Sequence, residues 1–248
     1  MQTATLQDGS EPFTVSVHHS QANSRLVLFA AGAGGLPERY STLLNTLAAA
    51  GCTVVAPHFE RLASPFPTDE ELRLRARRLS LSLNAFAQPG TVVAGVGHSI
   101  GASTLLALSG AQMWLGPGRQ VAIEPDARLS RLALLTAPLG FFQAPGALDA
   151  VHVPLQVWAG SEDTITLACQ AQWLADALRV RLPVDLRIAS GAGHFSFMDA
   201  PPPHAVETVP DKAAFLESYS VHVSNFLLHG DGGLSVFQTG ERSGPGGA

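Results

Sequence analysis

A serine flanked by glycines is the first feature of the chain that could do chemistry. Gly97-His98-Ser99-Ile100-Gly101 has the spacing G-x-S-x-G, in which a sharp turn between a strand and a helix exposes the serine hydroxyl. The glycines are needed because a Cβ at either position would meet the neighbouring strand or helix. An apolar run at 91–97 and an Ala- and Leu-rich segment at 102–108 supply that strand and helix. The pattern predicts a nucleophilic Ser99, although a serine that only caps a helix has the same local signature.

A pair of carboxylates follows another apolar run. Gly160-Ser161-Glu162-Asp163 comes directly after the run at 155–158. A carboxylate at the carboxyl end of a strand can accept a hydrogen bond from a histidine and fix its tautomer. We expect Asp163 to do this, but the adjacent Glu162 is an alternative that the sequence does not exclude. Asp163 as the cap of the next helix is the structural alternative.

One of the nine histidines lies on a glycine-rich loop. Gly191-Ala192-Gly193-His194-Phe195 follows an apolar run at 184–189, so the loop is accessible and its strand anchors it. This placement suits a general base, and we expect His194 to be that base. His58 closes a strand at the same sheet edge and is a pocket candidate, whereas we expect the side chain of His98 to point away from Ser99. The others lie on edges, on loops or in the last helix: His18, His19, His152, His204, His222 and His229.

The glycine-rich loop Ala31-Gly32-Ala33-Gly34-Gly35 ends an earlier apolar run at 25–31. Its small residues allow backbone N–H groups to approach an oxyanion, and we expect the N–H groups of Ala33 and Ile100 to be the two donors. Phosphate binding, as in a dinucleotide fold, is the alternative. Against it, the spacing G-x-G-G departs from G-x-G-x-x-G, and only Glu60 supplies an acid after the next strand.

The elements that must position these residues alternate between strand and helix. Continuous apolar runs predict buried strands at 25–31, 52–59, 91–98, 131–137, 154–159 and 184–189, and 13–18 alternates as an edge strand does. Amphipathic segments predict helices at 40–50, 69–86, 100–111, 167–179 and 211–228. The alternation predicts an α/β fold with a mostly parallel central sheet flanked by helices, whose ligands bind beyond the carboxyl ends of the strands. The arginine cluster in the second helix is interpreted as a solvated face; it comprises Arg73, Arg75, Arg77 and Arg78.

Composition limits the class of protein. The 248 residues are 46% hydrophobic and 14% charged, which suits a single α/β domain over 1–229 and a flexible Gly- and Ser-rich tail over 230–248. The formal net charge of −5, with scattered basic residues, gives no footprint for nucleic acid. The first ten residues lack the pattern of a signal peptide, and no apolar run has the length of a membrane span. Cys52 and Cys169 lack metal-ligand spacing, so we interpret both as reduced core thiols. We therefore expect a cytoplasmic protein with no metal and no organic cofactor.

With these motifs in place, the chain resembles the α/β-hydrolase superfamily over about 13–228, and within it the dienelactone-hydrolase and platelet-activating-factor-acetylhydrolase-like branches. The resemblance rests on AGAGG at 31–35, GHSIG at 97–101, GSED at 160–163 and GHFSF at 193–197, with three prolines at 201–203. It implies a triad in the chain order Ser99, Asp163, His194. Two departures stand out. Many relatives have His-Gly where this chain has Ala31-Gly32, and dienelactone hydrolases carry a cysteine where it has Ser99.

The expected activity is hydrolysis of a small or medium acyl ester, or of a thioester or lactone, through an acyl-enzyme on Ser99. Only 139–152 separate two predicted strands where the superfamily often inserts a lid, so we expect a minimal cap and an open pocket. Phe59, Trp114 and Phe195 are the candidates for substrate contact, with Phe141, Phe142 and Phe197 as further aromatics. The alternatives are a lyase or C–C bond hydrolase on the same fold and a ligand-binding protein without catalysis. The sequence indicates neither the substrate nor the oligomeric state.

Overall fold

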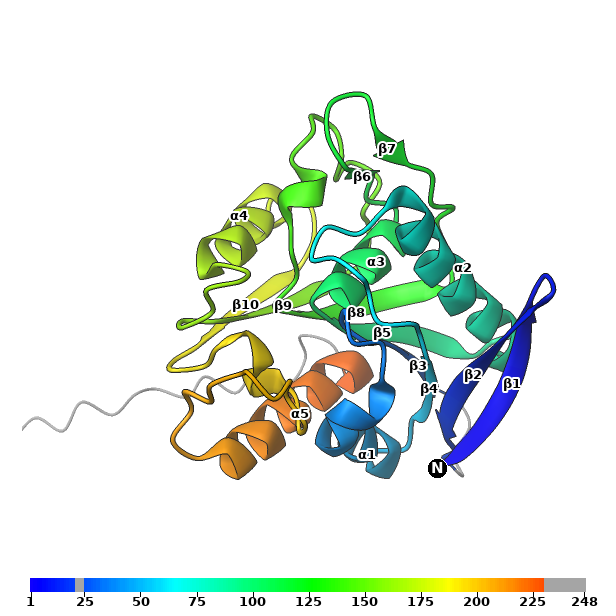
Figure 1. Ribbon diagram of the computed structural model, residues 1–248, viewed down its shortest axis with the longest axis horizontal. Coiled ribbons are helices and arrows are strands. Elements are labelled where there is room, and N and C mark those ends of the chain that lie inside the picture. Colours follow the sequence, from blue (N-terminus) through cyan, green and yellow to red (C-terminus); the bar gives the residue numbers. More distant parts are fainter. Residues whose placement is uncertain (21–24, 230–248) are drawn as a thin grey trace, which may run out of the picture.

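One eight-stranded sheet organises the molecule, with the strand order β1-β2-β4-β3-β5-β8-β9-β10 (Figure 1). This computed structural model describes residues 1–20 and 25–229. The strands are β1 (Gln2–Asp8), β2 (Glu11–His18), β3 (Arg25–Ala30), β4 (Thr53–Pro57), β5 (Val92–His98), β8 (Leu129–Leu135), β9 (Leu155–Gly160) and β10 (Val184–Ala189). β2 is antiparallel to both of its neighbours, and the remaining pairs are parallel. A small second sheet pairs β6 (Met113–Trp114) with β7 (Gln120–Val121).

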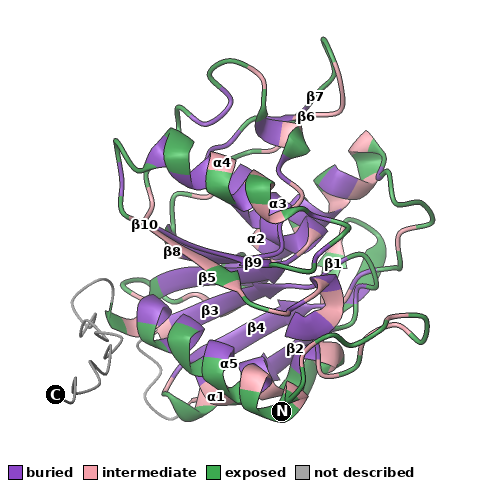
Figure 2. Ribbon diagram, turned by 90° about the vertical axis from the view of Figure 1, so that its left-hand side faces the viewer, coloured by how far each residue is buried: buried purple, intermediate pink, exposed green. Residues whose placement is uncertain are grey.

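Helices cover both faces of the sheet (Figures 1 and 2). α1 (Ser41–Ala49) and α5 (Lys212–His229) pack on one face, and α2 (Asp69–Phe86), α3 (Ile100–Leu108) and α4 (Ala168–Leu178) on the other. Strand β3 explains why its sequence is continuously apolar. Leu26 and Leu28 belong to the core under α2, α3 and α4, whereas Val27 and Phe29 belong to the core under α1 and α5. A mostly parallel sheet flanked by helices is therefore confirmed.

Helix α2 begins and ends at the residues that the sequence predicts. Thr68 and Glu71 form a capping box at its start, which satisfies two backbone N–H groups that have no partner in the helix. The sequence predicts that the arginine cluster of α2 is a solvated face, but the structure shows this for only part of the cluster. Arg75 is only 2% exposed, while the side chains of Arg73 and Arg77 are about half exposed, at 47% and 54%. The helical spacing accounts for this difference, because position 75 lies on the same stripe as the buried Leu72 and Leu79.

Two further expectations from the sequence are corrected. The strand at 13–18 is not at the edge, because β1 pairs outside it and forms the edge itself. Strand β1 was not predicted, since most of its residues are exposed and it has few apolar ones. Of the two cysteines, Cys52 is buried but Cys169 is exposed, so only the first is a core thiol.

The expected tail at 230–248 lies outside the described residues, and the single domain over 1–229 stays a prediction. Among the helices that the structure describes, none has both the length and the apolar character needed to cross a bilayer.

The carboxyl ends of the parallel strands position the residues singled out in the sequence. Ser99 follows β5, Asp163 follows β9 and His194 follows β10, while the glycine-rich loop at 31–35 follows β3. Because parallel strands end at the same edge of a sheet, segments far apart in the chain meet there. Short segments lie above this edge. They are the 3-10 turn Gly140–Phe142 and the β6–β7 hairpin, which projects beyond α3 at the top of Figure 1. The cap is therefore small, as expected.

Candidate active site

Ser99 occupies the turn between β5 and α3 with a strained backbone. Its φ is 53° and its ψ is −127°, a conformation that L-residues adopt rarely. A Cβ at Gly97 would lie 2.7 Å from the backbone nitrogen of Ala102, and one at Gly101 would overlap the carbonyl of Ala30. Both glycines are therefore required for this close approach. The side chain of Ser99 does not cap α3, so the helix-capping alternative does not describe it.

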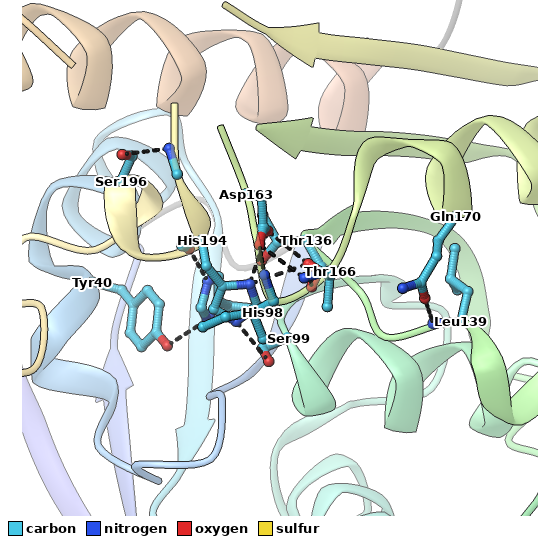
Figure 3. Close-up of polar contacts among 12 residues, drawn as sticks. Tyr40, His98, Ser99, Thr136, Leu139, Asp163, Thr166, Gln170, His194 and Ser196 are labelled. Atoms are coloured by element: carbon cyan, nitrogen blue, oxygen red, sulfur yellow. Dashed lines mark hydrogen bonds and ion pairs between the residues drawn. The ribbon is translucent and has the colours of Figure 1, made fainter. Parts of the chain in front are cut away.

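His194 lies between Ser99 and Asp163 (Figure 3). Its Nε2 is 3.0 Å from Ser99 Oγ, and its Nδ1 is 2.9 Å from Asp163 Oδ2. The histidine begins a short 3-10 helix, His194–Phe197, and is 6% exposed, whereas Ser99 is half-buried. Nδ1–H donating to a carboxylate leaves Nε2 as an acceptor for the serine proton. The structure thus brings the three residues together in the order that proton transfer from the serine requires.

Asp163 is the carboxylate at this site, and Glu162 is exposed with its Oε1 3.3 Å from Ser161 Oγ. The backbone N–H groups of Ile165 and Thr166 donate to Asp163 Oδ1, both at 2.8 Å. Oδ2 accepts from Thr166 Oγ1 at 2.6 Å as well as from His194. Burial raises the pKa of Asp163. The hydrogen bond and the electrostatic attraction from His194, together with the hydrogen bonds from Thr166, outweigh burial, so the pKa lies below its ordinary value. Asp163 is therefore held as a carboxylate.

A second strained residue supports the acid. Thr136, directly after β8, has a φ of 46°, which is exceptional for a β-branched residue. Its carbonyl oxygen lies 3.1 Å from Thr166 Oγ1, which shares its one proton between this oxygen and the closer Asp163 Oδ2. Its own hydroxyl is buried and has no partner among the described residues. Neither Thr136 nor Thr166 was identified from the sequence, because no local pattern distinguishes them from other loop threonines.

A buried series of hydrogen bonds runs beside Ser99 and His194, through His98 (Figure 3). His98 Nε2 is 2.9 Å from the carbonyl of His194, which can only accept, so Nε2 carries the proton and Nδ1 accepts from Tyr40 Oη at 3.0 Å. Tyr40 Oη in turn accepts from the N–H of Gly32 at 3.3 Å. Burial, with the neighbouring His194, lowers the pKa of His98 to about 3, so this imidazole stays neutral.

These hydrogen bonds link three of the segments that were singled out in the sequence. Gly32 belongs to the glycine-rich loop, His98 to the turn around Ser99, and His194 to the loop of the base. The rings of His98 and His194 are 5.0 Å apart between centroids. Tyr40 was missed in the sequence because its partner lies 58 residues further along the chain.

The two expected oxyanion donors have no competing partner. Within residues 1–20 and 25–229, neither the N–H of Ala33 nor that of Ile100 donates to a protein acceptor. Ala33 is exposed, and Ile100 is the first residue of α3. Helix N-termini leave their first N–H groups free, and such groups favour negative charge. The loop and the helix start can therefore each offer one donor.

A cavity of about 990 Å³ opens between the start of α2, the β6–β7 hairpin and the segment after β8. Ser99, Asp163 and His194 do not line it. Pro138 in its wall accepts at 2.7 Å from the hydroxyl of Ser103, which lies one turn after Ser99 in α3. The apolar and aromatic residues of its wall include Phe66, Trp114, Leu115, Pro138, Phe141 and Ala144.

The expected pocket aromatics differ in where they lie. Trp114 lines the cavity. Phe195 lies outside it, with its ring 5.1 Å from that of His194 and perpendicular to it. Phe59 is buried beside Gly35 and does not reach the cavity. His58 is held by Ser16 Oγ at 2.8 Å and by Glu38 at 3.2 Å. In the described part of the chain, no group of three metal-ligating side chains comes together.

No family model and no curated protein matches the chain. Solved structures match it at low identity. A protein of unknown function from Agrobacterium tumefaciens, classed as an α/β hydrolase, has a TM-score of 0.65 and 12% identity, with 91% of this chain and 96% of that one covered. An esterase from Pyrococcus furiosus has a TM-score of 0.62 and 14% identity, with 91% of each covered. A dienelactone hydrolase from Anabaena variabilis has a TM-score of 0.61 and 19% identity, with 92% and 96% covered. The chain therefore has the α/β-hydrolase fold.

Proposed function

We propose that this α/β-hydrolase-fold protein is a serine hydrolase, which cleaves a small or medium acyl ester through an acyl-enzyme on Ser99. The observation that carries the proposal is the alignment of Ser99 Oγ, the two nitrogens of His194 and Asp163 Oδ2, with contacts of 3.0 and 2.9 Å. The esterases and the dienelactone hydrolase among the similar structures support hydrolysis as the reaction class. Thioesters and lactones are substrates of the same chemistry.

The proposed reaction uses groups of this chain alone and needs no metal or organic cofactor. His194 Nε2 accepts the proton of Ser99 as Oγ attacks the carbonyl carbon, and Asp163 stabilises the imidazolium that forms. The N–H groups of Ala33 and Ile100 bind the carbonyl oxygen as it becomes an anion. The intermediate then expels the alkoxide, which takes the proton from His194. Water, deprotonated by His194, releases the acid from Ser99 in a second cycle.

The cavity beside Pro138 is the proposed site for the larger part of the substrate. Its wall contains Trp114 and Phe141, and its volume of about 990 Å³ exceeds what a two-carbon acyl group fills. We place an apolar acyl or alcohol chain there and the scissile carbonyl next to Ser99. Phe195, whose ring packs edge-on against the ring of His194, is proposed as a substrate contact near Ser99 rather than in the cavity. Phe59 is not proposed as a substrate contact, because it is buried away from the cavity.

Labelling with a fluorophosphonate tests the proposal. The reagent forms a covalent bond to an activated serine oxygen with loss of fluoride, and peptide mass spectrometry locates the adduct. We expect the adduct on Ser99, with loss of labelling and of p-nitrophenyl butyrate hydrolysis in Ser99→Ala and His194→Gln. Ser109→Ala is the matched control. Ser109 lies at the end of the same helix, with its hydroxyl bonded to Leu106, so labelling should be unchanged. A folded wild-type protein that is neither labelled nor active would favour ligand binding without catalysis. Labelling without esterase activity would favour a lyase or C–C bond hydrolase.

A further inference from the structure

A buried arginine lies directly beneath the glycine-rich loop. Arg75 is 2% exposed, and its guanidinium donates to four backbone carbonyls. Nη1 is 3.2 Å from the oxygens of both Ala31 and Gly32. Nη2 is 3.4 Å from the oxygen of Ala33 and 3.2 Å from that of Glu60. The Cζ also lies 4.7 Å from the centroid of the Phe59 ring.

Burying this charge is unfavourable unless its hydrogen bonds do something that an apolar side chain cannot. Burial lowers the pKa of Arg75 to about 10, which still leaves it charged at neutral pH. No carboxylate in the described residues forms an ion pair with it, so backbone carbonyls are its direct polar partners. Three of the four carbonyls belong to consecutive residues of one loop, and a planar fork of donors suits such a set better than a single ammonium group.

Because a peptide group is planar, the direction of each carbonyl in the loop also sets the direction of the next N–H group. In a trans peptide, the carbonyl of one residue and the N–H of the next point in opposite directions, and the described chain has no cis peptide. Because the Gly32 carbonyl faces Arg75, the N–H of Ala33 faces away from it. The same relation holds one residue earlier, since the Ala31 carbonyl faces Arg75 and the N–H of Gly32 reaches Tyr40. The free N–H of Ala33 is thus directed outward by a contact on its far side.

The composition of the loop leaves its peptide groups free to rotate unless contacts hold them. Gly32, Gly34 and Gly35 surround Ala33, and glycine rotates about φ and ψ with little steric penalty. If the peptide between Gly32 and Ala33 flipped, a carbonyl oxygen would replace the N–H that is to meet the oxyanion. A flip would also break the two hydrogen bonds that the Gly32 carbonyl accepts, from Arg75 at 3.2 Å and from the N–H of Gly35 at 3.0 Å, which is unfavourable.

We propose that Arg75 is a positioning residue, which holds the carbonyls of the loop so that the N–H of Ala33 stays directed at the reaction centre. This inference rests on the proposed hydrolase function. It also answers a departure noted in the sequence, where Ala31-Gly32 stands in place of the His-Gly of many relatives. In this chain the loop is held from the side of α2 by an arginine rather than by a side chain of the loop itself.

The test compares Arg75→Met and Arg75→Lys with Arg78→Met. Arg78 is a matched control on the same helix. It also stacks on a phenylalanine, Phe13, at 5.0 Å, but its ion pair is with Asp8, away from the glycine-rich loop. In Arg75→Met we expect kcat for p-nitrophenyl butyrate and the rate of fluorophosphonate labelling to fall about 10- to 100-fold, with KM within about threefold. Complete loss of one oxyanion donor lowers kcat about 10²- to 10³-fold, and a loop that flips keeps the donor for part of the time. Arg75→Lys retains the positive charge but not the planar set of donors of the guanidinium, so its rates should lie between those of the wild type and of Arg75→Met.

A second measurement reads the orientation of the loop directly and needs no activity. In the ¹⁵N–¹H spectrum we expect the Ala33 amide to broaden or to split in Arg75→Met and to stay unchanged in Arg78→Met. Both methionine variants lose stability, and Arg75→Lys provides a milder change if Arg75→Met does not fold. The two proposals fail in different ways. A wild type without labelling or activity overturns the hydrolase function, while the spectrum still decides the role of Arg75. An active wild type with equal rates and equal Ala33 signals in all the variants overturns the role of Arg75 alone.

Discussion

Removing one buried hydroxyl, in Tyr40→Phe, tests the direction of the hydrogen bonds behind the triad. Tyr40 Oη accepts from the N–H of Gly32 and donates to His98 Nδ1. The ring would remain in place in the variant, since it packs against Phe29 at 4.8 Å and against the ring of His98 at 5.5 Å. The change therefore removes two hydrogen bonds and almost no apolar contact. Reversing the tautomer of His98 would not help, because its Nε2 would then present a lone pair to the carbonyl of His194.

The magnitude follows from the two atoms that lose their partner. A buried donor or acceptor left without a hydrogen bond lowers stability by about 1–3 kcal/mol. Gly32 N–H and His98 Nδ1 together predict a loss of about 2–6 kcal/mol in the free energy of unfolding. Tyr219→Phe is the matched control, since Tyr219 is also buried and, within the described residues, its hydroxyl donates to one backbone carbonyl, that of Phe197, at 2.7 Å. That variant leaves one buried acceptor without its partner and should lose about 1–3 kcal/mol, half the loss expected for Tyr40→Phe.

Urea denaturation of the wild type and the two variants measures these losses. With a slope of about 1–3 kcal/mol per molar urea, Tyr40→Phe should lower the midpoint by about 1 M or more, and Tyr219→Phe by clearly less. If Tyr40→Phe were no less stable than Tyr219→Phe, the assignment of Tyr40 as the link between Gly32 and His98 would be wrong.

Three further predictions concern the acid, the buried histidine and the turn around Ser99. Asp163→Asn should lower kcat about 10³- to 10⁴-fold, because an amide no longer fixes the tautomer of the base, while Glu162→Gln should leave esterase kinetics unchanged. Because the pKa of His98 is lowered to about 3, the unfolded chain binds a proton below about pH 6.5 that the folded protein does not. The free energy of unfolding should therefore fall as the pH drops from 6.5 towards 3, by up to about 1.4 kcal/mol per pH unit. Urea titrations between pH 7 and pH 5 should show a weaker dependence of stability on pH in His98→Gln than in the wild type. Gly101→Ala should lower stability by more than about 3 kcal/mol or prevent folding, since its Cβ would overlap a backbone oxygen of β3, whereas Gly34→Ala, with nothing within 4 Å of its Cβ, should be near neutral in thermal unfolding.

Much of the fold could be predicted from the sequence because each element carries its own periodicity. The continuous apolar run of β3 identifies a strand buried on both faces, and the four-and-three spacing of α2 identifies a helix whose limits the structure reproduces. Strand β1 has no such signal. Its residues are mostly exposed, and pairing with β2 alone makes it a strand.

Ser99, Asp163 and His194, which we propose as a triad, stand out in the sequence for a similar reason. Each lies immediately beyond an apolar run, and the carboxyl ends of parallel strands meet at one edge. The choice between Glu162 and Asp163 could not be made, because adjacent residues after a strand differ only in the direction of their side chains. That direction depends on the turn in which the N–H groups of Ile165 and Thr166 reach Asp163.

Arg75 shows how a local signal can be present and still be misinterpreted. It lies three residues after Leu72 and four before Leu79, so its spacing places it on the apolar stripe of α2 rather than on the solvated face. Its place in a basic cluster, between Arg73 and Arg77, favours the opposite interpretation, a side chain on the solvated face. What decides the matter is the glycine-rich loop about 40 residues earlier, whose carbonyls accept from the Arg75 guanidinium. No pattern within α2 contains that requirement.

The strain in the site also depends on contacts that the sequence does not contain. Ser99 and Thr136 each have a positive φ, and each immediately follows a strand of the central sheet. In both, the backbone N–H continues the ladder to the next strand, from Ser99 to Leu135 and from Thr136 to Trp158, at 2.8 Å. Positive φ at such residues raises the energy by about 1–3 kcal/mol, and it persists only where the surroundings fix the backbone. The sheet fixes one end of each strained residue. The hydrogen bonds through His98 fix the segments around Ser99, so the same sheet edge holds both the serine hydroxyl and the imidazole of His194 toward each other.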